Sequence, residues 1–131
     1  MEKIQVLIAE DDPKALQTMK HSLSRLECQI TVATNGKRAL ALIKGTKFDV
    51  IVLDIALPDM DGLEVFAKAK IILPNLPPVI VTTGYLDAHF RNRAIELGAF
   101  DYLIKSPLSG KQLRESIISA VGKRKGYEKK S

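Results

Sequence analysis

Acidic residues stand directly after two apolar stretches of the chain, where they could bind a metal ion. Glu10 and Asp11 follow the apolar residues 4–9. Asp54 follows the apolar run 50–53. Carboxylates packed together repel one another and hold protons more tightly unless a cation is present. Hard oxygen ligands with room for water suit Mg²⁺. These residue types therefore predict a Mg²⁺ site, provided that the fold brings the three acids together.

Asp12 has a simpler explanation as the start of a helix. An aspartate side chain can accept hydrogen bonds from the first N–H groups of a helix, and proline fits the first helical position. Asp12 and Pro13 follow this pattern. Capping does not explain Asp54, because a charge at the end of a wholly apolar strand is costly unless it has a role.

Hydroxyl and ammonium groups stand at the ends of two later apolar stretches. Thr82 and Thr83 end the stretch 79–83, and Lys105 follows residues 101–104. Lys105 would supply a fixed cation with three donors, and Thr83 a hydroxyl that can rotate and donate. Together with a metal ion beside a carboxylate, these groups would form a socket for a dianionic group.

Several other chemistries lack support in the sequence. The glycine-rich loops that bind dinucleotides or nucleotide phosphates are absent, so nucleotide binding is not indicated. His21 and His89 fall within predicted helices and are expected at the surface. No Ser-His-Asp or Cys-His set stands at the strand ends, so covalent hydrolytic catalysis is not indicated.

The elements that would position these groups alternate between strand and helix. Near-continuous apolar strands, each followed by an amphipathic helix, favour an α/β fold with an open, doubly wound parallel sheet covered on both faces. Its ligand site lies beyond the carboxyl ends of the strands, where the strand order reverses. Strands are predicted at 4–9, 29–34, 48–53, 79–83 and 101–104, and helices at 13–26, 37–44, 63–73, 87–97 (with Gly98 as a left-handed C-cap) and 110–123.

Length and charge indicate one domain with a basic end. The chain has 131 residues, which suffices for a core without disulfides, and no domain boundary is evident before Gly122. Its net charge of +5 lies mostly in residues 122–131, which hold five basic residues and one acid. Such an end can attract polyanions, but more often it is a solvated end or a linker. Cys28 is the single cysteine and no apolar run has the length of a membrane span, so a reducing, cytoplasmic setting is expected.

Four motifs, in order and at the expected separations, resemble those of the receiver domain of two-component response regulators. They are residues 7–13, 52–62, 79–84 and 98–105, and the resemblance extends from Lys3 to about Lys123. It implies a flavodoxin-like (βα)5 sandwich with strand order 2-1-3-4-5. It also implies a receiver domain at 1–122, followed by a basic tail or the start of a linker at 123–131.

The resemblance assigns roles at the strand ends. Asp54 is implied to be the phosphoacceptor, which attacks a phosphohistidine on a partner kinase. Asp11 is implied to ligate Mg²⁺ directly, and Glu10 to act through water or from behind the ligands. Asp54 itself and the backbone carbonyl of Ala56 complete the implied metal site.

The resemblance also implies a switch. Lys105 matches the residue that pairs with the phosphoryl group, and Thr83 matches the switch hydroxyl. Tyr102 matches an aromatic that moves between outward and buried positions, although its spacing alone equally fits a half-buried strand residue. The surface formed by helix 87–97, strand 101–104 and helix 110–123 would then change its contacts.

The implied partners are proteins. They are a sensor histidine kinase or phosphotransfer protein, an output domain or effector, and a second copy through the switch surface. Direct binding of nucleic acid or membrane is not implied, and the chain is expected to be a signalling domain rather than an enzyme. One departure concerns the loop Lys105-Ser106-Pro107, because the family usually places proline directly after the lysine.

Two other functions on the same topology fit less well. Aspartyl-phosphate phosphatases place Asp-x-Asp on the first strand, and Glu10-Asp11-Asp12 does not match that spacing. A flavodoxin-like electron carrier needs a phosphate loop rich in Ser, Thr and Gly after the first strand. Three acids there would repel the phosphate of the cofactor.

Overall fold

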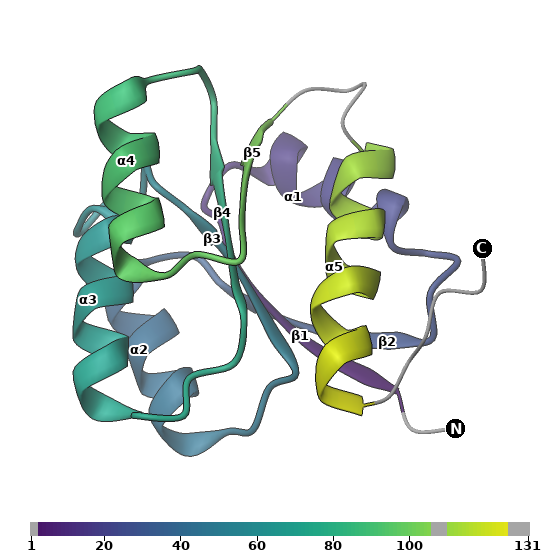
Figure 1. Ribbon diagram of the computed structural model, residues 1–131. Helices are drawn as coiled ribbons and strands as arrows, with labels where there is room; N and C mark the ends of the chain where they lie inside the picture. Colours follow the sequence, from purple (N-terminus) through teal and green to yellow (C-terminus); the bar gives the residue numbers. More distant parts are fainter. Residues whose placement is uncertain (1–2, 106–109, 126–131) are drawn as a thin grey trace.

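A single parallel sheet lies between two layers of helices (Figure 1). The computed structural model describes residues 3–105 and 110–125. The strands are β1 (Ile4–Ala9), β2 (Cys28–Ala33), β3 (Val50–Asp54), β4 (Val79–Thr83) and β5 (Asp101–Ile104), and the helices are α1 (Pro13–Ser22), α2 (Gly36–Gly45), α3 (Gly62–Ile72), α4 (Ala88–Leu97) and α5 (Gly110–Lys125). The strand order is β2-β1-β3-β4-β5, so the predicted fold class and strand order are confirmed.

The sheet separates two apolar cores, because successive side chains of a strand point to opposite faces. One core lies under α2, α3 and α4 and includes Ile51, Leu53 and Val81. The other lies under α1 and α5 and includes Val52 and Ile80. Both faces of β3 are therefore buried, and this explains why its sequence is continuously apolar rather than alternating.

The caps agree with elementary helix chemistry. Asp12 accepts a hydrogen bond from the Ala15 N–H at 2.9 Å, and Pro13 occupies the first turn of α1, as predicted. Gly98 has φ 91° at the end of α4, which confirms the predicted left-handed C-cap. Asn35 is the N-cap of α2 and accepts a hydrogen bond from the Arg38 N–H at 2.7 Å.

Element ends differ from prediction in several places. Helix α1 ends at Ser22 rather than at residue 26, and the Ser22 and Ser24 hydroxyls donate to carbonyls of its last turns. Leu23 nevertheless remains buried, so the apolar spacing continues past the end of the helix. Strand β2 starts and ends one residue earlier than predicted, β3 starts at Val50, and α5 continues to Lys125.

Two parts of the sequence prediction fall outside the described residues. The Ser106-Pro107 part of the loop after Lys105 is one, and the end of the basic segment, 126–131, is the other. In the part of the chain that is described, no helix combines the length and apolarity needed to cross a bilayer.

Candidate functional site

The carboxyl ends of β1 and β3 bring the predicted acids together. These neighbouring strands pair in parallel, and the strand order reverses beside them. Glu10, Asp11 and Asp54 each offer a carboxylate oxygen, and these atoms lie within 4.8 Å of one another. Asp11 is exposed, whereas the other two are buried. The set fits a hard divalent cation, since it offers oxygen ligands with one side open to water.

Lys105 joins the two buried carboxylates from the end of β5. Its Nζ donates to Glu10 Oε1 at 2.9 Å and to Asp54 Oδ2 at 3.1 Å. The Glu10 and Asp54 side chains are 0% and 2% exposed, and that of Lys105 is 21% exposed. The ammonium therefore neutralises part of a charge that the fold has removed from water.

Glu10 has hydrogen bonds on both carboxylate oxygens. Oε1 accepts from Lys105, and Oε2 accepts from the Asp12 backbone N–H at 3.1 Å. Asp54 Oδ1 accepts from the Ala56 N–H at 3.3 Å, which places the start of the next loop beside the carboxylate. Glu10 is thus fixed from two sides, whereas Asp11 faces solvent.

Asp54 and Lys105 shift each other's pKa. The pKa of Asp54 is raised to about 6, because burial and the nearby Glu10 raise it more than the Lys105 ammonium lowers it. For Lys105 itself, burial works to lower the pKa. Its hydrogen bonds to Glu10 and Asp54 outweigh that effect, so the net shift is upward. Lys105 therefore stays charged while Asp54 remains able to exchange a proton near neutral pH.

Thr83 and Tyr102 lie on neighbouring strands at the same end of the sheet. Thr83 is buried, and its hydroxyl donates to the Tyr85 carbonyl at 3.1 Å rather than to the acid cluster. Tyr102 pairs in register with Val81, two residues before Thr83. Burial raises the pKa of the Tyr102 phenol. The phenol oxygen is inaccessible and makes no direct hydrogen bond in the described part of the structure.

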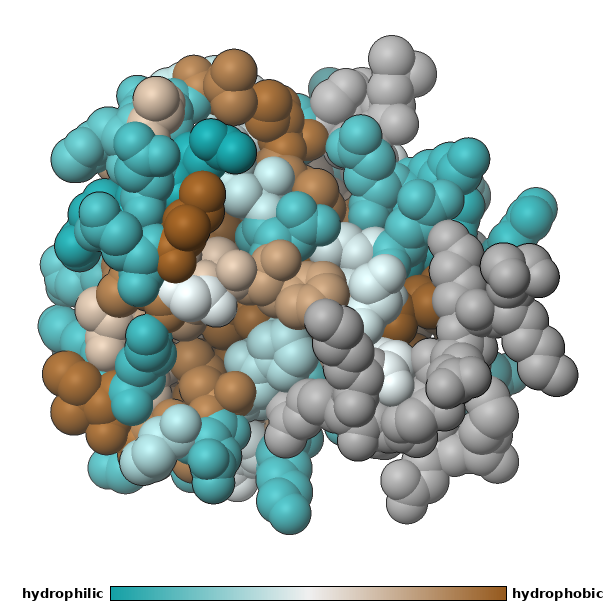
Figure 2. All heavy atoms as spheres, viewed as in Figure 1, coloured by the Kyte–Doolittle hydropathy of each residue, from teal (hydrophilic) through white to brown (hydrophobic). Residues whose placement is uncertain are grey.

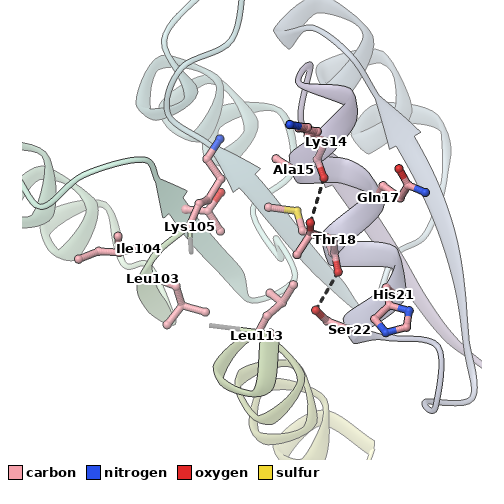
Figure 3. A pocket seen from close by; sticks show the side chains of 13 residues that line it. Lys14, Ala15, Gln17, Thr18, His21, Ser22, Leu103, Ile104, Lys105 and Leu113 are labelled. Atoms are coloured by element: carbon pink, nitrogen blue, oxygen red, sulfur yellow. Dashed lines mark hydrogen bonds between the residues drawn. The ribbon is translucent and has the colours of Figure 1, made fainter. Parts of the chain in front are cut away.

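Thr82 borders a cavity that sequence reasoning did not predict. The cavity has a volume of about 590 Å³ and lies between α1, the end of β5 and the start of α5 (Figure 3). Lys14 and Thr18 of α1 face Leu103 and Lys105 across it. The Thr82 hydroxyl oxygen is buried and has no hydrogen-bond partner in the described part of the chain.

Asp59 makes a contact that sequence reasoning did not predict. It lies in the loop between β3 and α3, and its carboxylate accepts hydrogen bonds from the Gly36 and Lys37 N–H groups at 2.6 and 2.9 Å. No spacing rule links Asp59 to a helix that begins 23 residues earlier. Its place within the motif of residues 52–62 is the only signal in the sequence.

Comparison with known proteins agrees with this geometry. A family model described as the response regulator receiver domain matches residues 6–118. The chain belongs to this family. The receiver domain match includes all the strand ends at which Glu10, Asp54 and Lys105 meet.

Curated relatives of this receiver domain are longer proteins. The transcriptional regulatory protein ZraR of Klebsiella oxytoca is 30% identical over 120 residues, which cover 92% of this chain and 27% of that protein. The response regulator MprA of Mycolicibacterium vanbaalenii is 32% identical over 102 residues, which cover 78% of this chain and 44% of that protein. The chain thus spans less than half the length of either relative.

Solved structures show the same receiver fold. A CheY-like receiver domain protein from Methanospirillum hungatei has a TM-score of 0.85 and 28% identity, and the match covers 97% of this chain and 100% of that one. A response regulator protein from Burkholderia pseudomallei has a TM-score of 0.74 and 28% identity, and the match covers 91% and 66%. The latter was solved with a phosphorylated aspartic acid, a calcium ion and citrate.

Proposed function

We propose that Asp54 accepts a phosphoryl group from a phosphohistidine on a sensor histidine kinase or phosphotransfer protein. The observation that carries this proposal is the buried contact of Asp54 with Lys105 beside two further acids. This arrangement holds one carboxylate in a fixed position and provides opposite charge around it. Family membership and the phosphorylated aspartic acid of the Burkholderia relative support the same reaction.

The transfer itself requires little covalent chemistry from the protein. An Asp54 carboxylate oxygen forms a bond to phosphorus, the phosphorus–nitrogen bond to the donor imidazole breaks, and the imidazole nitrogen leaves with the electron pair. Positioning and neutralisation of the phosphoryl oxygens supply most of the rate. Lys105 Nζ already lies 3.1 Å from Asp54 Oδ2, so its ammonium can pair with the negative charge of the new acyl phosphate.

A divalent cation, which we infer to be Mg²⁺, would be held by Asp11, Asp54 and the Ala56 carbonyl. Glu10 would act through water or from behind the ligands, as the resemblance to receiver domains implies, with its oxygens bound to Lys105 and the Asp12 N–H. When bound, the cation would neutralise charge on the phosphoryl oxygens. The three carboxylates fit this purpose because they offer one exposed and two buried oxygen ligands within 4.8 Å.

The phosphoryl group would act as a switch through Thr83. New acceptor oxygens would compete with the Tyr85 carbonyl, which accepts the Thr83 hydrogen bond at 3.1 Å. Movement of Thr83 would vacate space beside Tyr102, whose phenol oxygen has no hydrogen bond to lose among the described residues. A difference of about 1–3 kcal/mol between two existing states suffices for such coupling.

The responding surface would be that of α4, β5 and α5. Hydrophobic side chains interrupt the polar surface over α4 in Figure 2. Ile95 of α4 is 55% exposed, and Ile104 at the end of the edge strand β5 is 37% exposed. We infer that this face binds an output domain, an effector or a second copy of the chain. The relatives named as transcriptional regulators make an output domain the favoured occupant.

This role is that of a signalling domain rather than of an enzyme that turns over a metabolite. The chain would assist only its own phosphorylation and dephosphorylation, in the cytoplasm. The domain is proposed to occupy residues 1–122, with 123–131 as a basic tail or the start of a linker. Helix α5 continues three residues past that boundary.

Incubation with acetyl phosphate and Mg²⁺ tests the proposal. The intact mass of the wild-type chain should increase by one phosphoryl group, and Asp54→Asn should abolish the increase. Asp12→Asn is the matched control, because asparagine also caps helices and Asp12 binds only its own helix through its side chain. Equal labelling of wild type and Asp54→Asn, or loss of labelling in Asp12→Asn alone, would contradict the assignment.

A further inference from the structure

The middle of the loop after the phosphoacceptor is bound to the start of α2. Asp59 Oδ1 accepts from the Gly36 N–H at 2.6 Å, and Oδ2 accepts from the Lys37 N–H at 2.9 Å. The first turn of α2 contains no acidic residue of its own. Asp59 therefore supplies, from another part of the chain, the negative charge that the positive end of a helix favours.

Gly36 allows the loop to approach this closely. A Cβ atom at Gly36 would lie 2.4 Å from Met60 Cγ and 2.8 Å from Val65 Cγ2. The loop thus meets α2 through two neighbouring residues. Asp59 makes the polar contact, and Met60 packs on the bare backbone of Gly36.

The two ends of the loop are held separately. The Ile55 N–H donates to the Thr82 carbonyl at 3.0 Å, and the Gly62 N–H donates to the Ile55 carbonyl at 2.8 Å. Between these ends, in residues 57–60, the hydrogen bonds of Asp59 are the only ones described that reach another element. Asp59 therefore makes the hydrogen bonds that fix the middle of the loop, beside the packing of Met60 on Gly36.

We propose that Asp59 is a positioning residue for the cation and phosphoryl site: by binding the start of α2, it holds the loop that carries the Ala56 carbonyl and borders Asp54. This inference rests on the proposed function and adds to it a residue outside the acid cluster. Ala56 lies three residues before Asp59, and its N–H already donates to Asp54 Oδ1 at 3.3 Å. A shift of the loop would therefore move both the Ala56 carbonyl and a hydrogen bond to the phosphoacceptor.

The contact is present throughout the neutral pH range. The hydrogen bonds from the Gly36 and Lys37 backbone hold the pKa of Asp59 below its ordinary value. The carboxylate is therefore charged whenever Asp54 can act as a nucleophile.

The experiment compares Asp59→Ala with Asn35→Ala. Both variants remove hydrogen bonds from the first turn of α2, but only Asp59 reaches the loop after Asp54. Amide hydrogen exchange of Ala56, Leu57, Asp59 and Met60 is measured without metal, and Mg²⁺ affinity is measured by an NMR titration. In Asp59→Ala, we expect faster exchange at Ala56 and Leu57 and a Kd for Mg²⁺ raised about tenfold, the lower end of losses from residues behind metal ligands.

Asn35→Ala should lower the melting temperature while leaving loop exchange and Mg²⁺ affinity near wild type. Asp59→Asn keeps one neutral acceptor, so it should give intermediate values, and it serves if the alanine variant does not fold. Equal changes in Asp59→Ala and Asn35→Ala, or wild-type exchange in Asp59→Ala, would overturn the proposal. Failure of wild type to bind Mg²⁺ or to accept phosphoryl would instead refute the proposed function, and the exchange comparison in metal-free protein would still decide the role of Asp59.

Discussion

Replacing Asp54 by asparagine should stabilise the fold at neutral pH. The Asp54 carboxylate is buried beside Glu10, and burial together with that charge raises the pKa of Asp54 from 3.8 to about 6. Asparagine has nearly the same shape and carries no charge. The variant therefore removes repulsion and desolvation, while Lys105 keeps its hydrogen bond to Glu10 at 2.9 Å.

The size of the effect follows from the two pKa values. A rise from 3.8 to about 6 corresponds to about 3 kcal/mol of unfavourable free energy in the ionised native state. This figure already includes the attraction of Lys105 for the carboxylate. The asparagine amide adds an NH2 donor beside the Lys105 ammonium, so we expect a net gain of about 2 kcal/mol in the free energy of unfolding. With a urea dependence near 2 kcal/mol per molar, the midpoint should rise by about 1 M.

The sign of the pH dependence is also fixed. Between pH 3.8 and about 6 the native state binds more protons at Asp54 than the unfolded chain does. The wild-type free energy of unfolding therefore falls as pH rises through this window and levels off above it. Asp54→Asn lacks this dependence, so its advantage should be full at pH 7.5 and nearly absent at pH 4.

Urea unfolding of the two proteins at pH 4, 5, 6 and 7.5, without divalent cations, measures this difference. Mg²⁺ should then stabilise wild type more than Asp54→Asn, because the variant lacks one proposed ligand. A variant that is less stable than wild type at pH 7.5, or a difference that does not change with pH, would refute the reasoning about repulsion at the site.

Three further predictions concern packing around the site and at the start of α2. Thr82→Val should raise the free energy of unfolding by about 1 kcal/mol, because the buried Thr82 hydroxyl has no hydrogen-bond partner among the described residues. A lower melting temperature of the variant would show that the hydroxyl does make a hydrogen bond in solution. Gly62→Ala should cost about 3 kcal/mol and slow phosphorylation, since its Cβ would lie 2.0 Å from the Asp54 carbonyl oxygen. Gly36→Ala should cost less, about 2 kcal/mol, because its Cβ would meet the side chains of Met60 and Val65 rather than a backbone atom. Equal losses on urea unfolding would contradict this ranking.

The sheet and the acid cluster could be predicted because the sequence carries each signal locally. The apolar run of β3 has both faces buried, so its strand character and its central position are evident without a partner. Asp54 ends that run, and parallel pairing places it beside the residues that end β1. Topology then brings Lys105 to the same edge from the far end of the chain.

Contacts that depend on tertiary geometry could not be predicted. The end of α1 is an example, since Leu23 stays in the core although the helix has already ended. Asp59 is another, because its partners at Gly36 and Lys37 become neighbours only when α2 and α3 pack side by side. The cavity beside Thr82 depends on how far α5 stands from α1, which no spacing in either helix specifies.

The division of the interior into two cores has a consequence for signalling. Alternation along β3 and β4 places Asp54 and Thr82 toward the layer of α1 and α5, and Thr83 toward the layer of α2, α3 and α4. The side chains of the consecutive residues Thr82 and Thr83 thus point to opposite faces of the sheet. A phosphoryl donor bound over α1 and an output partner bound on α4 would not compete for space. Both proteins could therefore be bound to the domain at the same time.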